Sequence, residues 1–205
     1  MSIKGNLYVI AAPSGTGKTS LVKAVCDTLP EVMISISHTT RAPRPSETNS
    51  VNYYFTDRVK FESMIRAGDF LEHAIVFEHW YGTSKNWVAQ QLENGKDVIL
   101  EIDWQGHQQI KTIMPGAISI FILPPTLADL SSRLVLRRQD GPETIEKRLI
   151  DAKETISHIN EFDYVVLNDN FIQAKEDLIA IIMANRLTRA RQIKKLHNII
   201  KEIIA

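Results

Sequence analysis

A short glycine-containing loop constrains the fold of this chain more than any other stretch. It follows the apolar run 7–11 and precedes the helical pattern of Leu21, Val22 and Val25, which gives the order strand, loop, helix. The loop consists of Ala12, Pro13, Ser14, Gly15, Thr16, Gly17, Lys18 and Thr19. This order is typical of a phosphate-binding loop, in which backbone N–H groups and the helix start face an anion.

The residue types in the loop indicate separate roles. Gly15 and Gly17 permit close backbone approach, Lys18 adds a positive charge, and the Thr19 hydroxyl can ligate Mg²⁺. Ala12 stands where the usual pattern has its first glycine, so its backbone must leave room for a Cβ atom. We predict that the loop binds the phosphates of a nucleoside triphosphate; an ordinary glycine turn is the alternative.

The composition excludes several classes of protein. Lys plus Arg (24) equals Asp plus Glu (24), so no global field favours nucleic acid or an anionic membrane as partner. The single cysteine, Cys26, excludes an intramolecular disulfide and agrees with a reducing compartment. The N-terminus has no apolar signal segment, and prolines interrupt the longest uncharged run, 112–128. We expect a cytoplasmic protein with one main domain.

An arginine pair follows the second expected strand. Val32, Ile34 and Ile36 alternate with less apolar residues, as in a strand with two different faces. Prolines in the next segment favour an extended path that presents Arg41 and Arg44 together. Paired guanidinium groups suit a phosphate, although two solvated loop arginines are the alternative.

Residues 46–83 differ from the rest and indicate an inserted subdomain. Short strands are expected at 53–55 and 70–77, with a helix at 59–67 between them. The spacing of Glu72, His73, Glu78 and His79 fits no metal motif, and we expect a two-faced strand to direct Glu72 and Glu78 outward. Residues 81–84 should then turn into a helix capped by Ser84.

The alternation of strands and helices predicts a parallel sheet covered by helices. A buried strand is expected over 97–103 and ends in the acidic residue Asp103. A helix over 104–113 and another strand over 117–123 follow. Asp103 lies where a carboxylate that organises Mg²⁺ or orients a substrate belongs, at the carboxyl end of a strand beside the phosphate loop.

Two helices separated by a polar loop suit a lid. Thr126 and Asp129 form a capping box, the first helix runs to Arg133 and beyond, and Pro142 begins the second helix, which carries Arg148. Arginines directed at one end would close on phosphates and exclude water. A solvated helix face is the alternative.

The C-terminal part is expected to be a strand over 163–167 and one amphipathic helix from Gln173 to about Lys195. Leu178, Ile182 and Leu187 should lie on its apolar side. The tail is basic and is expected to be solvated, with contact to RNA or to a partner subunit left open.

The phosphate loop alone does not identify the acceptor. A GTPase would need an N-K-x-D motif, and the nearest candidate, Asn168-Asp169-Asn170, lacks the lysine. Motor and transporter ATPases are usually larger than 205 residues. Small kinases remain.

At this point a family resemblance becomes specific. The segments 12–19, 37–44, 70–73, 81–83, 101–106 and 133–148 resemble those of bacterial guanylate kinases in order and spacing. The resemblance implies an α/β fold of the P-loop nucleoside monophosphate kinase type, with a parallel core sheet. It also implies transfer of the γ-phosphoryl group of ATP to GMP or dGMP. The implied parts are a core (1–36, 94–124 and 156–205), a GMP-binding subdomain (37–93) and a lid (125–155).

The resemblance implies a role for each matching residue in the GMP site. The expected GMP-binding residues are Ser37, Arg41, Arg44, Tyr53, Glu72, Tyr81, Thr83 and Asp103. Arg41, Arg44 and Tyr53 would hold the phosphate. Ser37, Glu72 and Thr83 would bind the guanine, and Asp103 would lie between the two nucleotides.

The resemblance also implies catalytic residues, namely Lys18, Arg41, Asp103, Arg133, Arg137 and Arg148. ATP would bind Ala12 to Thr19, with Thr19 and the ATP phosphates holding Mg²⁺. The attacking group would be a GMP phosphate oxygen, which is largely ionised near neutral pH and requires no general base.

The chemistry of the base supports this assignment independently. Guanine has an acceptor at O6 and donors at N1 and N2, so the Glu72 carboxylate with the Ser37 and Thr83 hydroxyls is complementary to it. Adenine inverts this pattern, and buried groups would then be left unpaired.

Some positions depart from the family pattern. Ser50 stands where glycine is common, and Glu101 where aspartate is also common. Leu136 and Arg138 flank Arg137 in place of two glycines, which should stiffen the lid tip.

Two other functions are alternatives. A guanylate-kinase-like module could use the same cleft to bind a protein, but such modules tend to have an eroded phosphate loop. A kinase for another nucleoside monophosphate is disfavoured by Glu72 and Ser37. The oligomeric state is left open.

Overall fold

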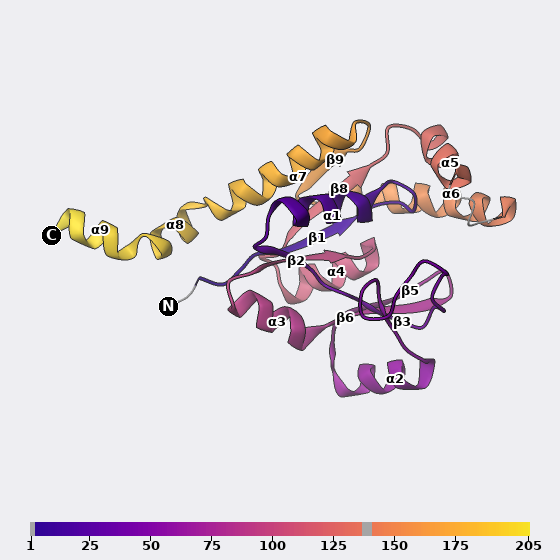
Figure 1. The fold of residues 1–205 in the computed structure, drawn as a ribbon, viewed down its shortest axis with the longest axis horizontal. Helices are drawn as coiled ribbons and strands as arrows, with labels where there is room; N and C mark the ends of the chain where they lie inside the picture. The colour runs from indigo at the N-terminus through magenta and orange to yellow at the C-terminus, as the bar shows by residue number, and fades with distance from the viewer. Residues whose placement is uncertain (1–2, 137–140) are drawn as a thin grey trace.

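A five-stranded parallel sheet forms the core of the computed structural model, which describes residues 3–136 and 141–205 (Figure 1). In spatial order its strands are β2 (Val32–Ile34), β7 (Asp97–Glu101), β1 (Leu7–Ala11), β8 (Ile118–Leu123) and β9 (Tyr164–Leu167). The predicted parallel core is confirmed. Because β1 is the central strand, the loop that follows it emerges from the middle of the sheet.

Alternate residues of β1 pack against different helix layers. Tyr8 and Ile10 join the cluster formed with α1 (Lys18–Thr28) and α7 (Phe171–Arg186). Leu7 and Val9 join the cluster on the other face, formed with α3 (Lys85–Glu93) and α4 (Trp104–Ile113). Burial of both faces explains why the sequence of β1 is continuously apolar.

Cys26 lies in α1, where burial raises the pKa of its thiol to about 11.

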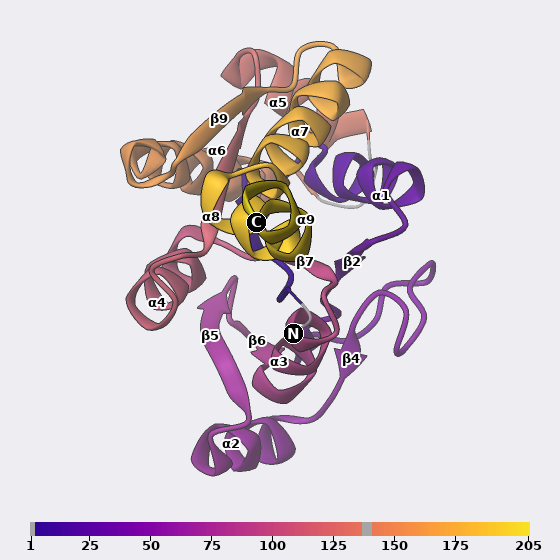
Figure 2. The same ribbon diagram turned by 90° about the vertical axis from the view of Figure 1, so that its left-hand side faces the viewer.

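A second, four-stranded sheet lies beside the core (Figure 2). Its strands, in spatial order, are β4 (Tyr54–Phe55), β3 (His38–Thr39), β6 (His79–Ser84) and β5 (Phe70–Val76), and α2 (Arg58–Ala67) accompanies them. The expected strands and helix are present, but residues 81–84 belong to β6 rather than to a turn. Ser84 caps α3 as expected, accepting a hydrogen bond from the Trp87 amide.

The backbone explains one departure from the family pattern. Ser50 has a φ of 65°, in the left-handed region that favours glycine. A serine there retains the turn at the cost of some backbone strain.

Two packed helices occupy the segment for which the sequence predicts a lid. They are α5 (Leu127–Leu136) and α6 (Pro142–Ser157), joined through a cluster of Leu130, Leu134 and Ala152. The Asp129 amide donates to the Thr126 hydroxyl at 3.0 Å, as a capping box requires. Pro142 is the first residue of α6, and a short 3₁₀ helix, η1 (Ile159–Glu161), follows.

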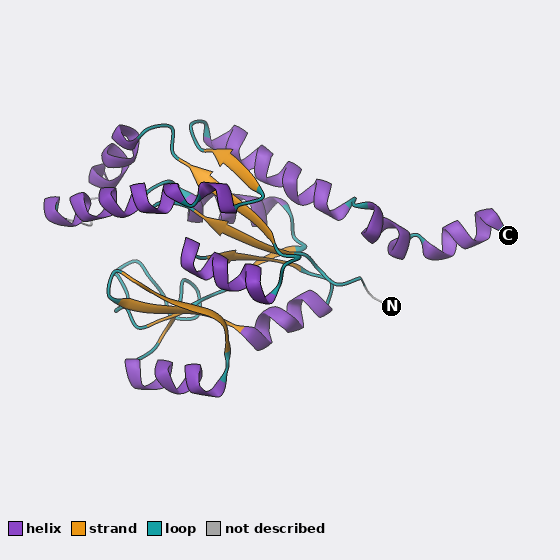
Figure 3. Cartoon of the chain, turned by 180° about the vertical axis from the view of Figure 1, so that it is seen from behind, coloured by secondary structure: helices purple, strands orange, loops and turns teal. Residues whose placement is uncertain are grey.

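The C-terminal helix is shorter than the sequence predicted. It ends at Arg186, and two further helices, α8 (Arg189–Lys195) and α9 (His197–Ile204), extend away from the body (Figure 3). The single helix predicted to Lys195 is wrong because Thr188 adopts a non-helical ψ of 142°. Leu187 is 64% exposed rather than part of an apolar face. Similarly, β2 ends at Ile34, so Ile36 lies outside the strand.

Within the described ranges, no helix combines the length and the apolar character needed to cross a membrane.

Candidate active site

The phosphate loop adopts a glycine-dependent conformation. Gly15 and Gly17 both have a φ of 96°, and α1 begins directly at Lys18. The Thr16 hydroxyl donates to the Pro13 carbonyl at 2.8 Å, which closes the loop on itself. Ala12 is not in the left-handed region, so the expectation that its backbone accepts a Cβ atom is confirmed.

Asn168 supports this loop from the end of β9. Its side-chain amide donates to the Thr16 carbonyl at 2.6 Å, and Asn168 is 4% exposed. A Cβ atom on Gly17 would lie 2.8 Å from the same amide nitrogen. Asn168 appeared in the sequence only as part of a rejected GTPase motif, and no local signal indicated this contact.

Lys18 lies beneath the loop among acidic groups. Its ammonium is 3.4 Å from the Ile102 carbonyl. Burial lowers the pKa of Lys18, while the charges of Glu101, Asp103 and Glu72 act in the opposite direction. The next residue, Thr19, donates from its hydroxyl to Glu101 at 2.8 Å. A hydroxyl and a carboxylate thus meet at the start of α1.

Arg41 is held by the carboxylate of Glu47, which no sequence pattern indicated. Its Nη2 donates to both oxygens of Glu47, at 2.7 and 2.9 Å, and its Nε donates to the Tyr81 hydroxyl at 3.3 Å. The Arg44 amide also donates to Glu47, at 2.8 Å. Burial alone would raise the pKa of Glu47, but these hydrogen bonds lower it overall.

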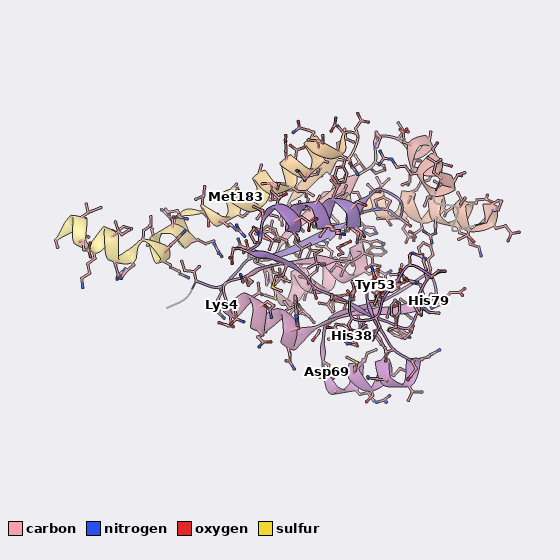
Figure 4. The ribbon with its side chains drawn as sticks, in the orientation of Figure 1. Lys4, His38, Tyr53, Asp69, His79 and Met183 are labelled. Atoms are coloured by element: carbon pink, nitrogen blue, oxygen red, sulfur yellow. The ribbon has the colours of Figure 1, made fainter. Side chains whose placement is uncertain are left out.

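Aromatic rings surround the same guanidinium. The Tyr53 ring centroid is 5.4 Å from the Arg41 carbon Cζ, within range of a cation–π contact. In Figure 4, Tyr53 is on the side of the small sheet nearer the core, and Asp69 is on the far side. Tyr53 and Tyr81 thus both lie against Arg41, and Arg44 is joined to the same group through Glu47.

Glu72 lies inside the protein, contrary to the expectation that its strand would direct it outward. It is 3% exposed because its face of β5 packs on α4. The Thr83 hydroxyl donates to its Oε1 at 2.5 Å. Burial raises the pKa of Glu72 to about 7, against the opposing effect of Thr83. Glu78, the other residue of that expectation, lies exposed in the turn between β5 and β6. Ser37 is also buried, directly before β3.

Asp103 links the two sheets electrostatically. It caps α4, where its Oδ1 accepts a hydrogen bond from the Gly106 amide at 2.9 Å. Burial raises the pKa of Asp103, while Gly106 and Lys18 lower it. The charges of Asp103 and Glu72 in turn act on Lys18. The acidic groups of the small sheet and the lysine of the phosphate loop thus share one site.

Arginines of α5 and α6 reach the phosphate loop. Arg133 donates to the Thr16 carbonyl at 3.3 Å and to the Asn168 carbonyl at 3.1 Å. Arg148 donates to the Ser14 hydroxyl at 2.7 Å. Arg137, expected to act with them, and its neighbour Arg138 lie outside the described residues.

Comparison with known proteins agrees with this geometry. The family model described as guanylate kinase matches residues 4–185. The chain belongs to the guanylate kinase family. Among curated relatives, the guanylate kinase of Coxiella burnetii is 53% identical over 201 residues, covering 98% of each chain. That of Alcanivorax borkumensis is 54% identical over 205 residues, covering 100% of this chain and 99% of the relative.

A solved guanylate kinase shares the fold. The crystal structure of guanylate kinase from Anaplasma phagocytophilum has a TM-score of 0.77 and 31% sequence identity. The match covers 93% of this chain and 90% of the other. The family match ends at Asn185, near the end of α7, so α8 and α9 of this guanylate kinase family member lie beyond it.

Proposed function

We propose that this member of the guanylate kinase family transfers the γ-phosphoryl group of ATP to GMP, giving ADP and GDP. The observation that carries the proposal is the placement of Glu72. It is a buried carboxylate bonded to Thr83, and its charge acts on Lys18 of an intact phosphate loop. A base-binding group and a triphosphate-binding loop therefore face a common site.

The acceptor end is suited to a guanine nucleotide. In our proposal Glu72 accepts hydrogen bonds from guanine N1 and N2, with Ser37 and Thr83 completing the polar contacts. Arg41 and Arg44, with the Tyr53 and Tyr81 hydroxyls, hold the phosphate. The same contacts are open to dGMP, because none of them involves the ribose.

The donor end binds ATP through residues Ala12 to Thr19. Lys18 neutralises phosphate charge, and Arg133 and Arg148 lie against the same loop, where they can stabilise charge on the transferred group. We extend this role to Arg137. Asp103 lies between the two nucleotides and orients the acceptor. Transfer then depends on positioning and charge neutralisation, since the ionised GMP phosphate attacks without a general base.

The residues at the start of α1 fit a magnesium ion. The Thr19 hydroxyl and the Glu101 carboxylate lie 2.8 Å apart, and oxygen donors of this kind suit a hard divalent cation. Mg²⁺ bound with the ATP phosphates would supply positive charge to the transferred group. Thr19 and Glu101 would hold it there.

Each part of the fold receives one function in this proposal. We assign the acceptor to the subdomain 37–93, closure to the lid 125–155, and the donor to the core made of 1–36, 94–124 and 156–205. ATP and GMP are the small-molecule partners, in the cytoplasm.

A coupled assay of ADP release tests the function. With ATP and Mg²⁺, GMP and dGMP should be good acceptors, while AMP, CMP and UMP should be poor ones. Because unpaired buried groups discriminate by about 10⁴ or more, the contrast with AMP should be large. Equal turnover of AMP would refute the assignment of Glu72. The absence of turnover with every acceptor would favour a binding module instead.

A further inference from the structure

Gly106 occupies a position that a larger residue cannot share with Glu72. It lies in the first turn of α4, and its φ is not in the left-handed region, so its backbone does not require glycine. Alanine is the better helix former at such a position. Glycine at this position is therefore explained by the lack of room for a side chain.

The space is filled by the Glu72 carboxylate. A Cβ atom built on Gly106 would lie 2.7 Å from Glu72 Oε2 and 3.3 Å from its carboxyl carbon, and 3.1 Å from Ile102 Cδ1. A methyl carbon and a carboxylate oxygen do not approach to 2.7 Å, so one of them would have to move. The other carboxylate oxygen, Oε1, is bonded to Thr83.

The helix is held in place, so the carboxylate is the part that can move. On one side of Gly106, its amide is bonded to Asp103. On the other side, Gln109 forms two hydrogen bonds to the backbone of His73, the residue after Glu72. The His73 amide donates to Gln109 Oε1 at 3.2 Å, and Gln109 Nε2 donates to the His73 carbonyl at 2.8 Å. Figure 2 shows α4 beside β5, where this pairing lies.

We propose that Gly106 is a positioning residue for base selection: its bare Cα leaves the volume in which Glu72 presents both carboxylate oxygens to guanine. The inference rests on the proposed function. A methyl group at position 106 displaces the carboxylate and spares the fold, because Glu72 can turn about its side-chain bonds. The N1 and N2 donors of guanine then lose a well-aligned acceptor.

The test is Gly106→Ala, assayed with GMP and with IMP, whose base lacks the 2-amino group. The KM for GMP should rise about tenfold or more, the effect of losing one hydrogen bond to a charged group. The preference for GMP over IMP should fall by a similar factor. The KM for ATP should stay unchanged, and the thermal midpoint should not fall. Gly116→Ala is the matched control, since a Cβ atom there meets nothing within 4 Å.

Two outcomes would overturn the proposal. One is a folded Gly106→Ala protein with unchanged KM for GMP and unchanged preference over IMP. The other is a loss of kcat at constant base preference, which would indicate that the substitution acts through Asp103. Failure of the proposed function itself gives a different result, because the wild-type protein would then not phosphorylate GMP.

A double variant covers the case in which Gly106→Ala does not fold. Glu72→Ala removes the carboxylate that the new methyl group meets. If the contact with Glu72 is the cause, Gly106→Ala with Glu72→Ala should fold. If the double variant also fails to fold while Glu72→Ala alone folds, the obstruction lies elsewhere and the proposal is overturned.

Discussion

The guanidinium of Arg41 lies against the carboxylate of Glu47, with Nη2 at 2.7 and 2.9 Å from its two oxygens. Both side chains are largely buried, at 14% and 12% exposure. Glu47 also accepts from the Arg44 amide, so one carboxylate fixes the loop that carries both arginines.

Glu47→Ala should therefore weaken GMP binding without affecting ATP. Loss of hydrogen bonds to a charged group costs about 1.5–3 kcal/mol, so the KM for GMP should rise at least tenfold, with a smaller change in kcat. Steady-state kinetics with varied GMP measure this effect. Glu62→Ala is the control, because Glu62 forms an exposed pair with Arg58 and such pairs contribute little. Equal effects of the two variants would contradict the positioning role.

Lys18→Ala should abolish turnover. Lys18 is the partly buried cation of the phosphate loop, and loss of charge stabilisation of this kind lowers kcat by about 10²–10³. ADP release at saturating GMP is the measurement. Lys23→Ala, an exposed lysine of the same helix, should behave as wild type. Activity retained in the Lys18 variant would remove the phosphate-loop argument.

Acidification should weaken the use of GMP through Glu72. Its pKa of about 7 means that the carboxylate is progressively protonated below neutral pH, when it can no longer accept from both guanine donors. We expect kcat/KM for GMP to fall below pH 7, approaching about tenfold per pH unit from Glu72 alone and more steeply below about pH 6, where the GMP phosphate is protonated as well. In the Glu72→Gln variant, the part of the pH profile due to Glu72 should be absent. Only the decrease caused by protonation of the GMP phosphate, near pH 6, should remain. Glu78→Gln, in the exposed turn after β5, should keep the wild-type profile.

The same group should make the protein less stable at higher pH. The pKa of Glu72 rises from 4.5 to about 7 on folding, so the folded state binds the proton more tightly than the unfolded state. Stability from this group is thus present below about pH 4.5 and lost as pH rises to about 7. Glu72→Gln, which mimics the protonated acid, should raise the free energy of unfolding at pH 8 by up to about 3 kcal/mol. The gain should vanish near pH 4.5. Urea unfolding at both pH values measures it, and an equal gain at both would contradict the assignment.

The sequence was sufficient for the parts of the site that depend on local patterns. The continuous apolar run of β1 is required by burial on both faces, and the spacing of Gly17, Lys18 and Thr19 is required by the loop. Asp103 was placed correctly at the carboxyl end of its strand, because parallel strands present these ends at one edge of the sheet.

The sequence was insufficient where distant segments meet. The register of β5 shifts between Phe70 and Glu72, so that both Leu71 and Glu72 are buried and simple alternation fails. The role of Glu47 depends on the loop folding back on Arg41. The helix break at Thr188 has no proline or glycine to mark it. In each case the deciding contact is tertiary.

The buried acid on β5 has a consequence for the energetics of substrate uptake. At pH 7 about half of the free protein molecules carry a proton on Glu72, since its pKa is about 7. In our proposal guanine is bound by the ionised form, so association should release up to about half a proton per nucleotide into the buffer at this pH. The measured heat of GMP binding will accordingly depend on the ionisation enthalpy of the buffer, and the slope of that dependence counts the protons released.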